Sequence, residues 1–403
     1  MPVLAEQDEP RHDSPWQVFL IFLRLGCTSF GGPIAHLGYF RQAFVARRRW
    51  LDEQAYAELV ALCQLLPGPT SSQVGMALGL GRAGGWGMLA AWLGFTLPSA
   101  LLLILCALGL ARYPQLADSG AVHGLKVFAV AVVAQAVSSM ARTLCPDARR
   151  RFLALFTAGL ALWLPGPGGQ LVGLLLAALI GRLALPAPAT PLGLSRQPGL
   201  SRRLGALALA LFALPLVLLP AWAALAGAPG IALLDGVYRA GALVFGGGHV
   251  VLPLLQAVVV PAGLVSDAQV LTGYGLAQAV PGPLFSFAGY LGALVATVLP
   301  AWLNGLLWTA LIFLPGALIL LAVLPFWQTL RQHEGWQRTL VGLNAGVVGI
   351  LLAALYDPVW TGAIHGLSDL ILALVALGLL LRAKGSPLLV ALFVVLATCL
   401  LNF

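Results

Sequence analysis

Long apolar runs, separated by short interruptions, fill the chain from residue 16 to its end. A helix needs about 20 residues to cross a bilayer. The longer runs predict spanning helices at about 85–110, 119–141, 148–164, 169–185, 204–226, 302–325, 337–356, 366–382 and 386–402. Shorter runs flank four interruptions, at about 16–30 and 33–46, 54–66 and 70–82, 233–245 and 248–260, and 268–280 and 284–297. Each short pair is either one broken spanning helix or one re-entrant hairpin.

Composition agrees with this pattern. Hydrophobic residues make up 60% of the 403 residues and charged residues only 9%. A soluble protein would carry about 25% charged residues. The sequence therefore predicts an all-α polytopic membrane protein that has the lipid bilayer as a partner.

The interruptions consist of helix-breaking residues. They read Phe30-Gly31-Gly32-Pro33 and Pro67-Gly68-Pro69 in the first half, and Phe245-Gly246-Gly247-Gly248 and Pro281-Gly282-Pro283 in the second. Such breaks free backbone N–H and C=O groups at membrane depth. Lipid tolerates this only where protein covers the break or where it lines a wet cavity. Four breaks in two matching pairs indicate the centre of a transporter.

The matching pairs belong to an internal repeat. When Phe30 is set against Phe245, Arg24 falls on Arg239, and after a one-residue gap Ser72 meets Ser286. This register predicts four parts of the chain. They are a cytoplasmic tail (1–15), a first repeat (16–185), a linker with a connecting transmembrane helix (186–231) and a second repeat (232–403).

The basic residues indicate how the repeats sit in the membrane. If each short pair is a hairpin, nearly every Lys and Arg outside the apolar runs faces the cytoplasm, as the positive-inside rule requires, and Arg112 faces out. The N-terminus is then cytoplasmic, the C-terminus lies outside, and the helix at 204–226 inverts the second repeat. Whether the broken segments span or re-enter stays open. The predicted fold is two inverted-topology repeats, each with two broken or re-entrant hairpins followed by spanning helices.

The breaks also predict chemistry. Each begins a half-helix whose first N–H groups lack intrahelical partners, and such an N-terminus attracts anions. Small polar side chains surround these starts, and the repeat adds an arginine six residues before each glycine-rich break. The candidate substrate-binding residues are Arg24, Ser29, Phe30, Gly31, Gly32, Pro33, Gln64, Pro67, Gly68, Pro69, Ser71, Ser72, Arg239, Gly246, Gly247, Gly248, His249, Gln278, Pro281, Gly282, Pro283 and Ser286.

Several of these residues have an alternative, purely structural interpretation. Arg24 and Arg239 lie within membrane segments, where charge is costly and usually functional. Either one could instead reach the interface or pair with a carboxylate, as Asp235 lies one turn from Arg239.

The remaining polar candidates are open in the same way. Gln64 and Gln278 could contact substrate or cap freed carbonyls, and His249 could bind an anion or a proton or simply begin its half-helix. Glu58 and Lys126 are secondary candidates, Glu58 for carrying a coupling proton. An interfacial ion pair with a nearby arginine is an equally good explanation for Glu58, and reach to the interface is one for Lys126.

Other classes of site are not indicated. The five cysteines lie singly in apolar sequence, so no spacing suggests a metal site or a disulfide framework. No cofactor is expected. The net charge of +8 fits topological retention, and no aromatic-interleaved basic patch indicates nucleic acid. Without a phosphate-binding Walker loop, ATP is not the direct driver.

At these motifs the chain resembles the chromate ion transporter family in its long two-domain form. The resemblance rests on Phe30-Gly31-Gly32-Pro33, Trp50-Leu51-Asp52-Glu53, the Cys63–Pro69 stretch and their echoes in the second half, and it covers about 16–402. It implies export of chromate, a sulfate-like divalent oxyanion, from the bacterial cytoplasm, hence an inner-membrane location and chromate resistance. The second half departs from the first by reading Gly248-His249 in place of Pro33-Ile34.

Competing functions remain. One alternative is a carrier whose normal substrate is sulfate or another inorganic anion and which also accepts chromate. Another is an anion channel. An intramembrane enzyme would need a cluster of acids, bases or metal ligands, which the sequence does not display, so we expect no enzyme. The coupling ion, with protons as one candidate, its stoichiometry, the physiological substrate and a homodimeric state are left open.

Overall fold

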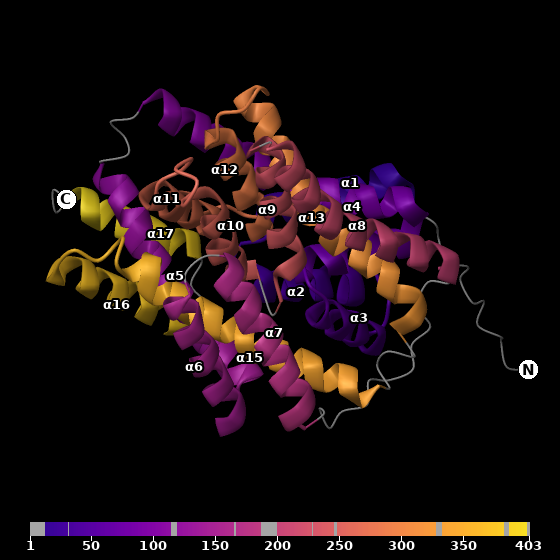
Figure 1. The fold of residues 1–403 in the computed structure, drawn as a ribbon. Coiled ribbons are helices and arrows are strands. Elements are labelled where there is room, and N and C mark those ends of the chain that lie inside the picture. The colour runs from indigo at the N-terminus through magenta and orange to yellow at the C-terminus, as the bar shows by residue number, and fades with distance from the viewer. Residues whose placement is uncertain are drawn as a thin grey trace, which may run out of the picture.

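The computed structural model describes residues 13–30, 32–113, 119–164, 167–186, 200–227, 229–245, 248–327, 333–382 and 387–400. Every regular element in these ranges is a helix (Figure 1). Within these ranges, five helices are long and apolar enough to cross a membrane, namely Thr70–Arg112, Gly120–Leu144, Arg202–Ala226, Ala301–Phe326 and Glu334–Trp360. The expected all-α polytopic class is confirmed.

In the described residues, the first half and the connecting helix contain eight α-helices. They are α1 (Pro15–Thr28), α2 (Gly32–Phe40) with the π-helical turn η1 (Arg41–Arg47), α3 (Glu53–Leu65), α4 (Thr70–Arg112), α5 (Gly120–Leu144), α6 (Ala148–Trp163), α7 (Pro167–Ala184) and α8 (Arg202–Ala226).

The second half repeats this order with shorter pieces at the breaks. Its elements are α9 (Pro229–Leu243), η3 (Gly248–Val250), α10 (Val251–Val259), α11 (Asp267–Ala279), η4 (Leu284–Ser286), α12 (Phe287–Leu294), α13 (Ala301–Val323), η5 (Leu324–Phe326), α15 (Glu334–Ala354), η6 (Leu355–Trp360), α16 (Leu367–Arg382) and α17 (Pro387–Leu400).

Side-chain caps fix the starts of several helices. Asp52 accepts a hydrogen bond from the N–H of Ala55 at the start of α3, and Ser266 accepts one from Gln269 at the start of α11. Such caps satisfy N–H groups that have no partner within the helix. Because Asp52 and Ser266 occupy matching positions in the repeat, the helix that leads into each Pro-Gly-Pro step begins in the same way in both halves.

Helix α4 is bent into two legs. Ala83 (φ −141°, ψ 26°) and Gly84 (φ 62°, ψ −153°) leave helical geometry. Beyond this turn the chain folds back, so that Gly79 of one leg lies directly against the backbone of Gly87 on the other. Only glycine permits so close an approach. The two legs correspond to the runs predicted at 70–82 and 85–110.

Helices from the two halves exchange packing partners. Helix α5 packs on α16 and α17 of the second half, while α15 packs on α6 and α7 of the first (Figure 1). A Cβ atom added to Gly124 of α5 would meet the Cα of Val395 at 2.8 Å, and Gly342 of α15 lies against the backbone of Ala177. Each half therefore supplies part of the other half's core.

Helix α8 connects the halves and lies largely outside this core. It packs on α9 and α13. Most of its large side chains are exposed, among them Leu207, Val217 and Leu225. An apolar surface of this kind is stable against lipid tails and costly in water, which agrees with a membrane-spanning connection.

Candidate functional site

The four breaks fall where the sequence placed them. Helix α1 ends at Thr28 and α2 begins at Gly32, and α3 ends at Leu65 before α4 begins at Thr70. In the second half α9 ends at Leu243 before η3, and α11 ends at Ala279 before η4. Three candidate glycines lie outside the described residues, and they are Gly31, Gly246 and Gly247.

The breaks of one half bond to the breaks of the other. The N–H of Gly68 donates to the carbonyl oxygen of Val244 at 2.6 Å, and the N–H of Gly282 donates to that of Ser29 at 3.0 Å. Gly68 matches Gly282 in the repeat, and Val244 matches Ser29. The two bonds are therefore equivalent, and each satisfies backbone groups that a break has freed.

Close packing of backbone atoms reinforces both of these hydrogen bonds. Gly68 (φ +119°) and Gly282 (φ +111°) hold a conformation that residues with a side chain rarely adopt. A Cβ on Gly68 would meet the Cα of Gly316 at 2.9 Å, and one on Gly282 would meet Ser99 Oγ at 2.8 Å. Ser99 follows Pro98 as Gly316 follows Pro315, so these contacts also match. Here and below we call this region, where the four breaks meet, the crossing.

A buried histidine joins the elements on the first-half side of the crossing. His36 of α2 is fully buried, with Nε2 3.1 Å from the Ser29 carbonyl oxygen and Nδ1 3.3 Å from Ser71 Oγ. A carbonyl only accepts, so Nε2 carries the proton in this pair. In the neutral ring Nδ1 then accepts the proton of the Ser71 hydroxyl. His36 thereby fixes Ser71 at the start of α4.

Buried polar atoms at the start of α4 are incompletely satisfied. Gln73 Nε2 donates to the carbonyl oxygens of Pro67 and Gly316 at 2.9 and 3.0 Å. Within the described ranges, however, no hydrogen-bond partner reaches Gln73 Oε1 or the hydroxyls of Ser29 and Ser72. Pro69 at the N-cap offers no side-chain bond either. Buried polar groups usually have partners, and a bound oxyanion would accept from these hydroxyls and from the first N–H groups of α4.

The second-half side of the crossing carries different chemistry. His249 Nδ1 lies 2.8 Å from the hydroxyl of Tyr274 and 3.3 Å from Gln278 Nε2. Ser286 is fully buried, and its hydroxyl lies 2.7 Å from that of Ser99. The departure at Gly248-His249 therefore brings in tyrosine and glutamine partners, and the two sides of the crossing are not equivalent.

The remaining break residues lie at or beside the crossing. Ser71, Ser72, Pro69 and Pro283 are buried. Others are half-buried, namely Phe30, Gly32, Pro33, Pro67 and Pro281. Gly248 begins η3 directly after the break.

The charged candidates are not gathered at the crossing. Arg24 is exposed on α1, and Gln64 is exposed on α3. Arg239 Nε bonds to Asp235 at 2.7 Å, and its terminal nitrogen donates to the Leu216 carbonyl of α8 at 3.0 Å. Arg239 thus has the carboxylate partner that the sequence offered as an alternative. Two secondary candidates lie elsewhere, as Glu58 is buried on α3 and Lys126 is half-buried on α5.

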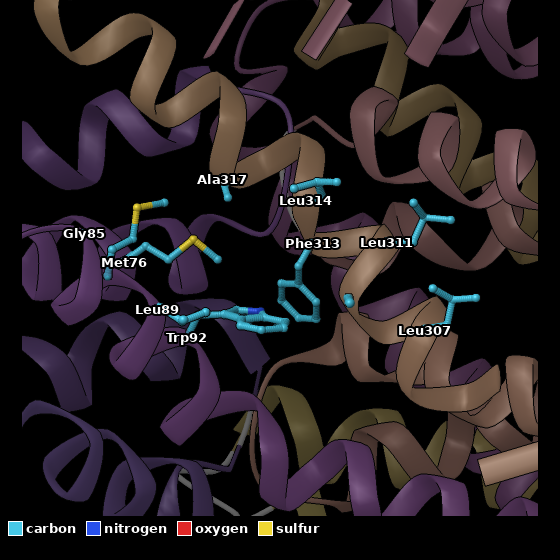
Figure 2. Close-up of a pocket in the computed structure, with 11 residues that line it drawn as sticks. Met76, Gly85, Leu89, Trp92, Leu307, Leu311, Phe313, Leu314 and Ala317 are labelled. Carbon is cyan, nitrogen blue, oxygen red and sulfur yellow. The ribbon is translucent and has the colours of Figure 1, made fainter. Parts of the chain in front are cut away.

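A cavity of about 400 Å³ between α4 and α13 is unsuited to an anion. Figure 2 shows its lining, in which Met76, Leu89 and Trp92 come from α4 and Phe313 and Leu314 from α13. The rings of Trp92 and Phe313 meet edge to face at 5.9 Å. The lining offers hydrocarbon, sulfur and aromatic surface, which suits apolar matter such as an acyl chain.

Sequence reasoning missed four buried polar residues of the crossing, which are His36, Gln73, Ser99 and Tyr274. A signal existed for two of them. Ser99 directly follows the Leu-Pro step that both halves share, and Gln73 directly follows Ser72 in the same half-helix. His36 and Tyr274 have no counterpart in the repeat, so the internal alignment did not mark them.

An all-helical body with exposed apolar helices and paired interior breaks defines a polytopic membrane protein of the transporter type. Comparison with known proteins identifies the family. A protein-family model described as "Chromate transporter" matches residues 16–228 and, a second time, residues 231–401. The chain belongs to the chromate transporter family.

Relatives from several organisms resemble most of the chain. A chromate transport protein of Pseudomonas aeruginosa is 28% identical over 357 residues, covering 85% of this chain and 80% of the relative. One of Cupriavidus metallidurans is 28% identical over 384 residues, covering 93% and 90%. An uncharacterized transporter of Methanocaldococcus jannaschii is 24% identical over 355 residues, covering 86% and 85%. No solved structure matches the chain.

Proposed function

We propose that the protein is a secondary transporter that exports chromate across the bacterial cytoplasmic membrane and so confers chromate resistance. The observation that carries this proposal is the crossing itself, where buried hydroxyls and the start of α4 meet between two halves. Membership of the chromate transporter family and the names of the Pseudomonas and Cupriavidus relatives support chromate as the substrate.

The first-half side of the crossing suits a tetrahedral oxyanion. The hydroxyls of Ser29 and Ser72, which have no hydrogen-bond partner among the described residues, and the first N–H groups of α4 are all donors to an anion. The positive end of the helix dipole adds to them. The protein scaffold already holds Ser71 through His36. Donors that are positioned before the anion arrives lose little conformational entropy on binding it.

The membrane potential supplies a driving force for export. A charge moving across 100 mV gains about 2.3 kcal/mol, so a dianion leaving a negative-inside cell gains about twice that. Proton antiport would add to this gradient. The buried Glu58 and the buried His36 are the residues of the first half that we assign to a proton step.

We further propose that residues 16–185 and 232–403 are inverted repeats around α8, with a cytoplasmic N-terminus and an external C-terminus. Three observations support this arrangement. The family model matches the chain twice in succession. The backbone hydrogen bonds of Gly68 and Gly282 are equivalent. The packing of α5 on α16 and α17 mirrors that of α15 on α6 and α7.

Chromate flux into everted membrane vesicles tests the proposed function. We expect saturable uptake that grows with a positive-inside vesicle potential. Sulfate as competitor separates a chromate transporter from a general anion carrier, since strong competition would favour the latter. Flux that fails to saturate and ignores an imposed pH gradient would instead indicate a channel, and absence of uptake would refute export.

Cysteine accessibility tests the topology. In a background with the native cysteines replaced by serine, Arg48→Cys and Gly85→Cys lie at exposed positions. We expect both to react with an impermeant maleimide from the cytoplasmic side only. Val298→Cys, at a fully exposed position before α13, is the external control. Labelling of the Arg48 position from outside would refute the hairpin arrangement and favour broken spans.

A further inference from the structure

Three side chains that commonly bind metal ions meet at one place away from the crossing. They are His123 of α5, His365 just before α16, and Asp369 in the first turn of α16. One ligand atom from each residue lies within 4.8 Å of the others. His123 comes from the first half and the other two from the second, so no sequence spacing revealed this group.

The surrounding structure holds the carboxylate in place. Asp369 is buried, its Oδ2 accepts from the backbone N–H of His365 at 2.9 Å, and its Oδ1 lies 2.8 Å from His123 Nε2. The hydrogen bond from the backbone N–H to Oδ2 orients the carboxylate. In metal sites, hydrogen bonds from neighbouring groups orient the ligating side chains in the same way. His365 is exposed, so the group is open to solvent on that side.

A purely structural explanation of this group is a hydrogen bond that holds α16 against α5. That role needs only His123 and Asp369. The third residue is the observation that points to a cation. The ring of His365 stacks on the ring of His123, with centroids 5.8 Å apart and an interplanar angle of 28°. This places a second imidazole beside the same carboxylate. Neither the bond between His123 and Asp369 nor the bond from the His365 backbone N–H to Asp369 requires an imidazole at position 365.

We propose that His123, His365 and Asp369 form a binding site for a divalent first-row transition cation, with Zn²⁺ the best match. Two imidazoles and one carboxylate are a usual ligand set for Zn²⁺, with water in the fourth position. Zinc binds these ligands at about 2.0–2.2 Å, so small side-chain rotations suffice to converge three atoms already this close. His123 would take its Nδ1–H tautomer, which frees Nε2 to bind the metal in place of its hydrogen bond.

The site would join the two halves. A cation held by α5 and α16 ties the first half to the second at a place away from the breaks. Its occupation should therefore stabilise the folded protein, because anything that binds only the native state does so by mass action. The inference does not rest on chromate transport, and its test needs no transport assay.

The test uses the full-length protein, purified in detergent through an affinity tag that contains no histidine. After chelation and dialysis, Zn²⁺ is titrated in, and bound metal is counted by elemental analysis while thermal unfolding is followed. We expect about one Zn²⁺ per chain and a higher melting temperature. We expect His365→Ala and His123→Ala to weaken binding at least about tenfold.

His333→Ala is the matched control, because His333 is an exposed histidine outside the site, at the start of α15. It should bind Zn²⁺ as the parent does. His365→Ala is the decisive variant, since its side chain is exposed and its loss leaves the bond between His123 and Asp369 intact. Parent-like Zn²⁺ binding in His365→Ala, or no Zn²⁺ bound by the parent protein in the titration, would overturn the proposal.

Discussion

Gly68 donates its backbone N–H to the carbonyl oxygen of Val244, 2.6 Å away, and so closes the first Pro-Gly-Pro step onto the second glycine-rich break. The bond needs Gly68 at φ +119° and the backbone of Gly316 in direct contact. The backbones of the two halves are in direct contact here, and the Gln73 side chain bonds to both of them.

We expect Gly68→Val to abolish chromate flux and Gly68→Ala to lower it severely. A Cβ at this position clashes with the Gly316 backbone. The conformation alone, at φ +119°, costs about 1–3 kcal/mol for a residue with a side chain. Vesicle flux at matched membrane abundance measures the effect.

The controls for Gly68 are Gly38→Ala and Ser72→Ala. Gly38 has open space around it and should tolerate alanine. Ser72→Ala removes one hydroxyl and leaves the backbone donors, so it should retain more flux than either Gly68 variant. Equal losses at Ser72 and Gly68 would show that side chains, and not backbone N–H groups, bind the anion.

His36→Ala should lower both stability and flux. The change leaves Ser71 without its partner and removes one of two donors to the Ser29 carbonyl, inside a fully buried site. Buried groups left unsatisfied cost about 1–3 kcal/mol each. Thermal unfolding in detergent should show a lower melting temperature, whereas His333→Ala should unfold as the parent does. A parent-like melting temperature for His36→Ala would contradict this role.

Arg239→Gln should destabilise the protein more than it impairs binding. It leaves Asp235, which is largely buried, without its cation. Removal of one partner from a buried pair is much more costly than removal of both. We therefore expect the double variant Arg239→Gln/Asp235→Asn to recover membrane abundance and much of the flux. If the double variant is as inactive as the single one, Arg239 contacts the anion directly.

Arg24 should behave in the opposite way. It is exposed on α1, and no carboxylate is recorded within ion-pair distance of it among the described residues. We expect Arg24→Gln to retain normal abundance and lose nearly all flux, and Arg24→Lys to keep weak flux, because lysine keeps the charge without the forked donors. Normal flux in Arg24→Gln would assign this arginine a structural role.

Alkylation of Cys145 should depend on pH in an unusual way. Burial raises the pKa of this thiol, which follows α5, to about 11. The thiolate is the reactive form, so the rate with iodoacetamide should keep rising through pH 10, where an ordinary thiol has reached its plateau. Peptide mass spectrometry over pH 7–10 measures this. A plateau near pH 9 would contradict the raised pKa.

The sequence predicted the segments and breaks well because glycine and proline disrupt helices by local geometry. The starts of α4 at Thr70 and of η4 at Leu284 agree with the predicted runs, and the turn at Gly84 separates two runs that were predicted as distinct. The spacing of four residues also indicated that Arg239 could pair with Asp235, because residues four apart lie on the same face of a helix.

Partners that lie far apart along the chain could not be predicted. His36 lies in the predicted run at 33–46, but its partner Ser71 lies in the separate run at 70–82. The side chains that gather near Asp369 come from both halves. Segments that are apolar on every face also give no signal of which face packs on protein and which on lipid. For that reason the sequence placed Arg24 within a membrane segment without indicating that α1 leaves it exposed.

The exchange of bonds between the breaks has a consequence for biosynthesis. The carbonyl oxygen of Ser29 accepts from the N–H of Gly282, and the N–H of Gly68 donates to the carbonyl oxygen of Val244. At about 5–20 residues per second, the ribosome reaches Gly282 roughly ten to fifty seconds after Ser29. During that delay the nascent first half must keep its broken segments hydrated or shielded by the insertion machinery, because bare lipid would not accept them.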